Sequence, residues 1–289
     1  MRINPNVVAA RFVRDLRVRE ENLSKYHHQL SSGRRIEWPS DDPVAAGESL
    51  RLRAALREVD RYMNNSEEAR SWLEVADSAL NEAIATMQRV RELNVQAANG
   101  TLSTDSRKAV LEEVKELSNH LVQVGNSMYG DRYIFAGQKT KTMPFDTAGG
   151  YHGDDGTLLR EIGPGVRLVI NVPGDQAFGS AFAALADLQA ALEADDVGAL
   201  GGSCLEKVDK GLTDLLNART KLGGTLSRAE MSYYRLKDDR YSISKLLSDT
   251  EDVDMAEAIF RLRTEENAYR TALAAGAHII QPTILDFLR

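Results

Sequence analysis

The chain of 289 residues is long enough to bury the core of one or two domains. Aromatic residues make up only 6% of it and charged residues 27%, which suits long solvated helices better than a compact enzyme with a deep pocket. The net charge of −7 does not favour nucleic-acid binding, and no run approaches the roughly 20 apolar residues of a membrane span.

The first predicted element is an amphipathic helix over about residues 9–30. Apolar or aromatic side chains recur there every three or four residues, and Gly33 follows as a stop signal. The first 35 residues carry eight basic and three acidic side chains, so this arm is basic. Arginines interrupt each apolar stretch, which excludes a cleaved secretion signal. The pattern favours a solvated face of an assembly helix over contact with an acidic partner or a membrane surface.

The second predicted helix begins at Asp42 and Pro43 and runs to about Ala98. The Asp42 carboxylate can accept hydrogen bonds from free backbone N–H groups, and Pro43 suits the first helical position. Twelve of fourteen heptad positions along this helix are apolar or aromatic, and the two exceptions are Ser66 and Asn94. This is the strongest heptad pattern in the chain.

Two more long helices are predicted downstream. Ser103-Thr104-Asp105 is a helix start, and an unbroken apolar seam follows it to Met128. The last central seam runs from Leu205 to Leu247, with eleven of thirteen positions fitting despite the Gly223-Gly224 pair. Three long seams on one chain must bury one another, so a helical bundle or rod is expected.

The middle of the chain has a different pattern. Tyr133-Ile134-Phe135 is typical of a strand, and residues 166–172 alternate between apolar and other side chains before Pro173-Gly174. Glycine-rich turns surround both stretches. We expect a small β-hairpin region, inserted at the tip of the helical rod.

No convergent set of catalytic, metal-binding or cofactor-binding residues is found, so neither enzymatic activity nor a cofactor is expected. The cluster His152-Gly153-Asp154-Asp155 is typical of a turn rather than a metal site. Cys204 is the only cysteine, which excludes an intrachain disulfide, and it lies in a Gly-Gly-Ser-Cys linker without a nearby histidine.

The two chain ends are amphipathic helices without a third apolar partner nearby in the sequence. The C-terminal one starts at the boundary Asp254-Met255 and contains Pro282, which should kink it. An isolated helix pair buries little surface and leaves one flank exposed. Antiparallel pairing of the ends together with packing on neighbouring subunits would cover both flanks, but the residues alone leave open whether the chain polymerises.

Taken together, both terminal blocks and several central motifs resemble the bacterial flagellin superfamily, and within it the hook-associated protein 3 family (FlgL type), which forms the hook–filament junction. The resemblance is carried by residues 1–3, 29–43, 88–101, 132–137, 217–230, 254–259 and 285–288. It implies a mainly α fold, a long coiled-coil rod built from the N- and C-terminal halves with a small β-hairpin region in the middle of the chain. Three parts are implied: residues 1–32 and 254–289 as an inner coiled-coil assembly domain, 33–131 and 181–253 as the rod, and 132–180 as the β region.

The same resemblance implies an assembly interface along the terminal helices and one stretch of the second helix. Its expected members are Phe12, Leu16, Leu23, Leu30, Arg89, Arg91, Leu93, Ile259, Leu262, Tyr269, Leu273, Ile280 and Phe287. Asp42 and Pro43 are expected to cap the second helix.

The implied function is that of a structural adaptor in the bacterial flagellum. It would form a ring between hook-associated protein 1 and flagellin, outside the cell, after export without a cleaved signal peptide and with the help of a flagellar export chaperone. Its partners would be those two proteins and further copies of itself. The alternatives are a short flagellin of the bulk filament and, from other classes, a cytoplasmic coiled-coil scaffold or a hydrolase with a hidden site.

Overall fold

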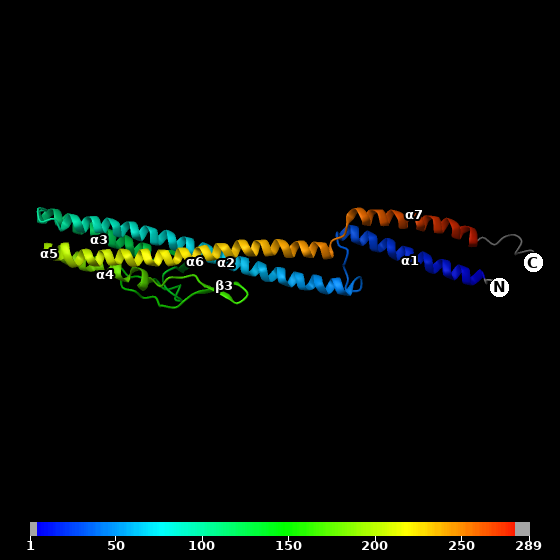
Figure 1. The fold of residues 1–289 in the computed structure, drawn as a ribbon, viewed down its shortest axis with the longest axis horizontal. Helices are drawn as coiled ribbons and strands as arrows, with labels where there is room; N and C mark the ends of the chain where they lie inside the picture. The colour runs from blue at the N-terminus through cyan, green and yellow to red at the C-terminus, as the bar shows by residue number, and fades with distance from the viewer. Residues whose placement is uncertain (1–4, 281–289) are drawn as a thin grey trace, which may run out of the picture. The chain divides into compact units, whose positions relative to one another are not determined.

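The computed structural model describes residues 5–280 of the chain, which are mainly helical with two pairs of short strands (Figure 1). The chain divides into two compact units. We call residues 1–57 and 240–289 the terminal unit and residues 58–239 the central unit. This division falls inside the two longest helices, whereas the sequence placed the change of domain at residues 32 and 254. The long helices are α2, Pro43–Ala97, and α6, Leu205–Glu251.

In the terminal unit, α1 (Pro5–Ser32) and α7 (Met255–Ile280) lie side by side and antiparallel (Figure 1). The stop predicted at Gly33 is confirmed. This residue has a φ of +71°, which glycine adopts without strain, and its N–H donates to the Gln29 carbonyl at 2.9 Å. The expected kink at Pro282 lies outside the described residues.

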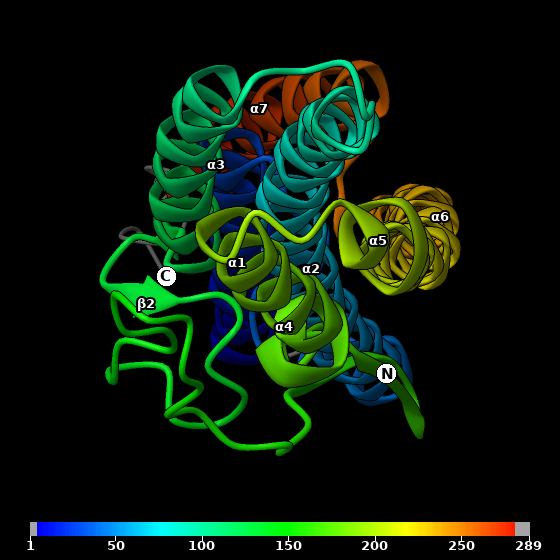
Figure 2. The same ribbon diagram turned by 90° about the vertical axis from the view of Figure 1, so that its left-hand side faces the viewer.

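The central unit is built on helices that lie side by side (Figures 1 and 2). The predicted helix start at Ser103 is confirmed, because its Oγ accepts from the Ser106 N–H at 3.2 Å at the beginning of α3, Thr104–Gly125. Helix α6 passes through Gly223-Gly224 without a break. Side chains of the predicted seams are fully buried, among them Leu80, Met87 and Leu121.

One helix of this unit was missed. Helix α4, Gly174–Glu193, lies partly within the stretch assigned to the β region, and it buries Phe178 and Leu185. A three-residue helix, α5 (Val197–Ala199), and a π-helix, η1 (Leu200–Cys204), then lead directly into α6. The expected Gly-Gly-Ser-Cys linker is therefore helical, and the thiol of Cys204 is buried.

Four short strands form two antiparallel pairs. Strand β1 (Met128–Tyr129) pairs with β2 (Arg132–Tyr133), and β3 (Leu159–Gly163) pairs with β4 (Val166–Val169) with a register shift between Glu161 and Gly163. Ile134 and Phe135, expected in a strand, are fully buried but follow β2.

The β3–β4 hairpin packs against the sides of two helices. Asn65 Nδ2 of α2 donates to the Glu161 carbonyl at 2.8 Å, and Ser232 Oγ of α6 donates to the Ile162 carbonyl at 2.9 Å. This differs from the expected position at the tip of the helices. A two-stranded pair cannot bury its own apolar face, and Leu168 is only 2% exposed because the helices cover it.

Candidate assembly surface

The inner face of the α1–α7 pair combines polar and close apolar contacts. Arg19 Nη1 lies 3.0 Å from a Glu265 carboxylate oxygen, and Asn22 Nδ2 donates to the other oxygen at 3.5 Å. Further along, the Phe12 ring rests on the backbone of Gly276, where a Cβ would come within 2.2 Å of the ring. Gly276 therefore permits close approach of the two helices at this point.

The side chains predicted for the interface lie on different faces of this pair. Those on α1 are all half-buried: Phe12, Leu16, Leu23 and Leu30. On α7, Leu262 is buried and Tyr269 is half-buried, whereas Ile259 and Leu273 are 50% and 46% exposed. The side chain of Ile280 and all of Phe287 lie outside the described part of the chain.

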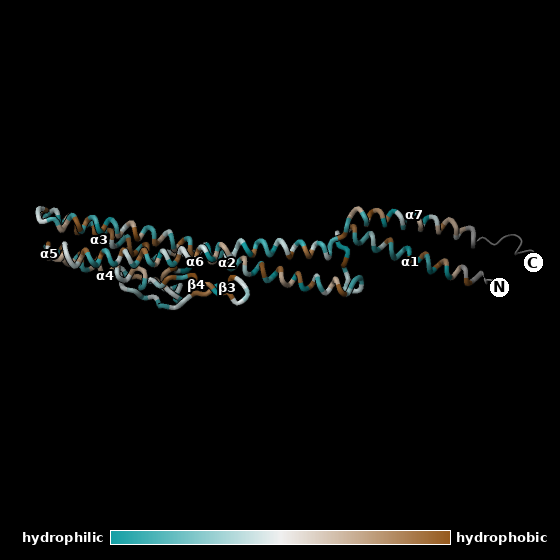
Figure 3. Tube along the Cα trace, in the orientation of Figure 1, coloured by the Kyte–Doolittle hydropathy of each residue, from teal (hydrophilic) through white to brown (hydrophobic). Residues whose placement is uncertain are grey.

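Large apolar side chains of both helices also remain exposed. Hydrophobic and hydrophilic residues alternate along each helix (Figure 3). Phe260 on α7 is 70% exposed, and Val13 and Val18 on α1 are each about half exposed. Sequence reasoning missed Phe260 because helical spacing assigns only one of two adjacent residues to the apolar stripe, and Ile259 was the residue assigned. Among the described residues of the terminal unit, the buried hydrophobic side chains are Ile36, Ala258 and Leu262.

Two short linkers pair with each other where the terminal helices end. The Arg35 N–H donates to the Glu251 carbonyl at 2.6 Å, and the Val253 N–H donates to the Gly33 carbonyl at 3.0 Å. Asp42 Oδ1 accepts from the Val44 and Ala45 N–H groups at 3.1 and 3.0 Å, so it caps α2.

A buried carboxylate holds this joint together. Glu251 is 6% exposed, and its carboxylate accepts hydrogen bonds from Ser49 Oγ and, at 2.7 Å, from Arg53 Nη2. Burial by itself would raise the pKa of Glu251, but the hydrogen bonds from Arg53 and Ser49 outweigh it and hold this pKa below its ordinary value. The end of α6 is thereby fixed to the start of α2 within the terminal unit.

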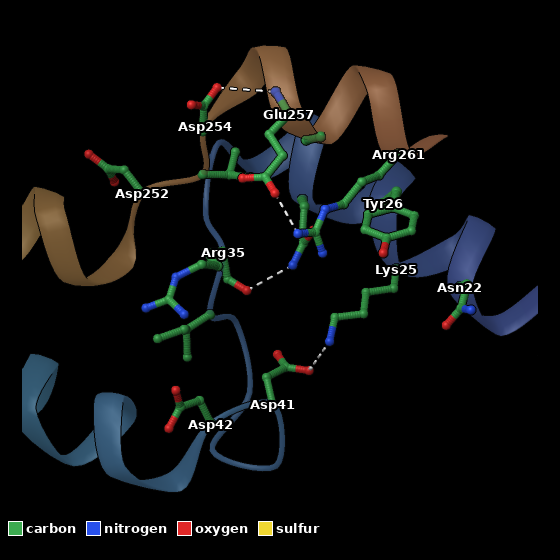
Figure 4. A pocket seen from close by; sticks show the side chains of 14 residues that line it. Asn22, Lys25, Tyr26, Arg35, Asp41, Asp42, Asp252, Asp254, Glu257 and Arg261 are labelled. Carbon is green, nitrogen blue, oxygen red and sulfur yellow. Dashed lines mark hydrogen bonds and ion pairs between the residues drawn. The ribbon is translucent and has the colours of Figure 1, made fainter. Parts of the chain in front are cut away.

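Beside the joint lies a cavity of about 400 Å³ (Figure 4). Lys25 and Tyr26 of α1 and Arg261 of α7 line it together with acidic side chains of the linkers. Lys25 Nζ lies 3.9 Å from Asp41, and Arg261 pairs with Glu257. Because these cations and carboxylates face each other, the cavity wall is a set of ion pairs rather than an array aimed at a reacting group.

The stretch of α2 predicted for the interface lies in the central unit and is divided between surface and core. Arg89 Nη2 lies 2.7 Å from Glu113 of α3, and Arg91 Nε lies 2.6 Å from Asp209 of α6, both pairs being exposed. Leu93 is only 2% exposed and belongs to the hydrophobic core. Leu93 lies beside the seam of α2, one heptad after Thr86, which is also buried. Its side chain therefore faces the other helices of the central unit and is not part of an exposed surface.

The turn predicted around Asp154 has a structural role in the β region. Asp154 Oδ1 accepts from the Gln138 and Gly156 N–H groups at 2.6 and 3.0 Å, which lowers the pKa of the carboxyl group, with the Gln138 bond contributing most. Among the described residues, no group of three or more His, Cys, Asp and Glu side chains is placed to hold a metal ion. Within residues 5–280, no helix has the length and apolar character to cross a membrane.

Comparison with known proteins gives the family. The model of the bacterial flagellin N-terminal helical region matches residues 3–140, and that of the C-terminal helical region matches residues 205–288, together well over half of the chain. Flagellar hook-associated protein 3 of Salmonella typhimurium is 29% identical, with 90% of each chain covered. The protein of the same name from Escherichia coli is 28% identical, with 95% of this chain and 96% of the relative covered. Flagellin of Bacillus subtilis is 29% identical over the whole of both chains.

Solved structures agree on the fold. FlgL of Bacillus cereus superposes with a TM-score of 0.62 at 21% identity, covering 68% of this chain and 99% of that one. The flagellar junction protein FlgL from Legionella pneumophila gives a TM-score of 0.60 at 17% identity, covering 71% and 100%. By the two family models and the curated relatives, the chain belongs to the bacterial flagellin superfamily, as a structural flagellar protein of the hook-associated protein 3 type.

Proposed function

We propose that this subunit is the adaptor at the hook–filament junction, where copies of it form a ring between hook-associated protein 1 and flagellin. The observation that carries the proposal is the α1–α7 pair, which leaves large apolar side chains exposed on its outer faces. Exposed apolar patches of this kind are typical of interaction surfaces. The names of the hook-associated relatives favour the junction as the place where that surface is used.

In this proposal, the outer faces of α1 and α7 contact neighbouring subunits. The surface comprises Val13, Val18, Ile259, Phe260 and Leu273, all 46% exposed or more. The half-buried side chains of the inner face, such as Leu16 and Leu23, become fully covered when neighbours pack against the pair. Such a surface is not satisfied by one copy, so assembly and burial occur together.

A second contact surface involves Arg89 and Arg91. Both side chains already make exposed ion pairs within the chain, and such pairs stabilise a fold by only about 0–1 kcal/mol each. They can therefore exchange Glu113 and Asp209 for carboxylates of another subunit at little cost. This surface would set orientation and register between subunits rather than supply most of the affinity.

Export is proposed to use the flagellar export apparatus without a cleaved signal peptide. Before assembly, the exposed apolar faces of α1 and α7 are a liability for aggregation, and a flagellar export chaperone that covers them would remove it. Helices with so few buried side chains also unfold at low cost, which suits passage through a narrow channel.

A short flagellin of the bulk filament is the second candidate. The observation that favours it is the likeness to Bacillus subtilis flagellin, which is as high as that to the hook-associated relatives and covers the whole of both chains. The two functions differ in copy number and position: an adaptor occupies one short band, whereas a flagellin occupies the entire filament.

Labelling of intact flagella tests the proposal. The side chain of Asp131, in the turn between β1 and β2, is 82% exposed, whereas Cys204 is 3% exposed. Asp131→Cys should therefore react with a thiol-specific fluorescent or gold label, and the unchanged chain, with Cys204 alone, is the matched control. A single band at the hook end is expected. Label along the filament would favour flagellin, and label confined to the cell would favour a cytoplasmic scaffold.

A further inference from the structure

Asn94 is a polar residue at a heptad position of α2 where the pattern predicts an apolar side chain. Asn94 is fully buried, between Val90 and Ala97, which are also fully buried. An unpaired amide in such a place is costly, because burial removes its hydrogen bonds to water. The surroundings of Asn94 must therefore supply partners.

Those partners are the two ends of the π-helix η1. In the amide orientation that satisfies both groups, Asn94 Nδ2 donates to the Leu200 carbonyl at 3.1 Å and Oδ1 accepts from the Leu205 N–H at 3.2 Å. Leu200 is the first residue of η1, and Leu205 is the first residue of α6. The Leu205 N–H is shared with the Gly202 carbonyl.

The Leu200 carbonyl and the Leu205 N–H are five residues apart, which is the spacing that a π-helix brings together, so the Asn94 amide binds the two groups that define this single π-turn. The π-turn is also closely packed on α2, since Leu200 and Cys204 are buried and the position of a Gly201 Cβ lies 3.7 Å from Ala98 Cβ. Water cannot serve these groups from that side. The amide of Asn94 has an NH2 group that donates and a carbonyl oxygen that accepts, so one side chain serves both backbone groups at once.

We propose that Asn94 is a positioning residue that recognises the π-turn and thereby fixes the register of α6 against α2. Elsewhere along the seam, most contacts between the helices are made by apolar side chains that tolerate a slip of one heptad. Other polar contacts in the central unit, such as Arg219 with Asp77 and Arg91 with Asp209, are ion pairs near the surface. Any such slip would bury the Asn94 amide against apolar neighbours. A single buried asparagine specifies register in coiled coils by the same means, at some expense of stability.

The register fixed in this way also places the Arg91–Asp209 pair, which joins the same two helices three residues before Asn94. The pair of hydrogen bonds between Asn94 and the π-turn is a property of the single chain and is independent of what the protein does. Its consequence for assembly, through the Arg91 surface, rests on the proposed function.

The test compares the two polar positions of the same seam. Ser66 is also fully buried, but its Oγ has no hydrogen-bond partner. Asn94→Leu should shift the unfolding equilibrium of the full chain toward the unfolded state by roughly tenfold or more in denaturant titration. Ser66→Ala should leave it within about threefold of the parent or stabilise it.

Native-state hydrogen exchange separates positioning from plain core packing. In Asn94→Leu, and in the milder Asn94→Ala, the exchange rate of the Leu205 amide and of the amides in the following turn should increase. This increase should be about tenfold larger than any increase in α3. An unfolding equilibrium of Asn94→Leu equal to that of the parent would overturn the proposed role of the Asn94 hydrogen bonds. Destabilisation with uniformly faster exchange across the central unit would overturn the positioning role. Both results are read on the monomer, so they are distinct from failure of the junction assignment in flagellar labelling.

Discussion

The central and terminal units are built from similar long helices but differ in how much of their apolar surface one chain can bury. The central unit has a continuous core in which Leu80, Met87 and Phe178 are completely buried. In the described part of the terminal unit, only Ile36, Ala258 and Leu262 are buried hydrophobic side chains, and Phe260 is mostly exposed. Helix stability in proteins comes mainly from packing. From this difference we propose that the central unit folds on its own contacts and that the terminal unit is ordered by contacts with neighbouring subunits.

The largest expected effect comes from removing an aromatic side chain from each unit. Phe178 packs against the rings of Phe135 and Phe145 with centroids 4.9 and 5.6 Å apart. Phe178→Ala should lower the free energy of unfolding of the monomer by about 3–5 kcal/mol in denaturant titration. The matched change Phe260→Ala should alter it by no more than about 0.5 kcal/mol, yet weaken attachment to flagella. Similar losses of monomer stability in both variants would erase the difference between the units.

A charge on the exposed face of α7 should separate folding from assembly. Leu273→Asp adds a carboxylate at a position that is 46% exposed in the single chain, so export and monomer stability should be unchanged. In the assembled state, the unpaired charge would be buried at a cost of several kcal/mol, and attachment should be lost. Immunoblots of sheared flagella and of culture medium measure both. Leu273→Met, which keeps volume and polarity, is the control, and normal filaments on Leu273→Asp would contradict the account.

The buried carboxylate of Glu251 should make the joint sensitive to acid. Its pKa is depressed in the folded state, so its contribution is complete above the ordinary value of about 4.5 and is lost as the pH falls through the lower folded-state pKa. Glu251→Gln should destabilise the terminal unit at neutral pH by about 1–3 kcal/mol and flatten its pH dependence below 4.5.

Hydrogen exchange around residues 33–36 measures that local effect. Glu257→Gln is the matched control, because the Glu257–Arg261 pair is more than half exposed and should contribute little. An acid-induced opening that is the same in Glu251→Gln and in the parent chain would assign the sensitivity to other carboxylates.

The smallest expected effect is at the close contact of α1 and α7. Gly276→Ala would place its Cβ within 2.2 Å of the Phe12 ring, so the ring must move. We expect a loss of about 1–2 kcal/mol in the stability of the packed helix pair, seen as faster exchange in α1 of the assembled protein, with no change in the central unit. Adding Phe12→Leu should restore part of the loss. An unchanged exchange rate in α1 of the assembled protein would mean that the contact between Phe12 and Gly276 does not hold the pair together.

Sequence patterns predicted the helices whose signals are local. Heptad patterns and capping residues predicted the ends of α2 and α6 to within a few residues. Such signals are local, because an apolar repeat or a capping residue such as Asp42 affects the backbone only within one or two helical turns. The same kind of pattern was present in α4, where Ala177, Phe178, Ala181 and Phe182 recur at helical spacing. It was missed because nearby glycines and a strand pattern assigned part of this stretch to the β region.

The remaining differences depend on contacts between distant segments. The position of the β3–β4 hairpin is set by Asn65 and Ser232, which sequence spacing does not connect to it. The role of Asn94 depends on a π-turn more than one hundred residues away, and a π-turn has no sequence signature of its own. For the assembly surface, periodicity selected half-buried side chains of α1 and both buried and exposed side chains of α7, and it passed over Phe260, which is more exposed than its neighbour Ile259.

The central claim, that the terminal helices are ordered by assembly and the central unit by its own core, is tested most directly by limited proteolysis with mass spectrometry. In a verified monomer, we predict rapid cleavage within residues 1–32 and 254–289 and a resistant fragment from about Ser40 to about Asp252. In isolated flagella, the same terminal segments should be protected. If both ends resist cleavage in the monomer as well as the central unit does, they form a preformed domain and the account is wrong.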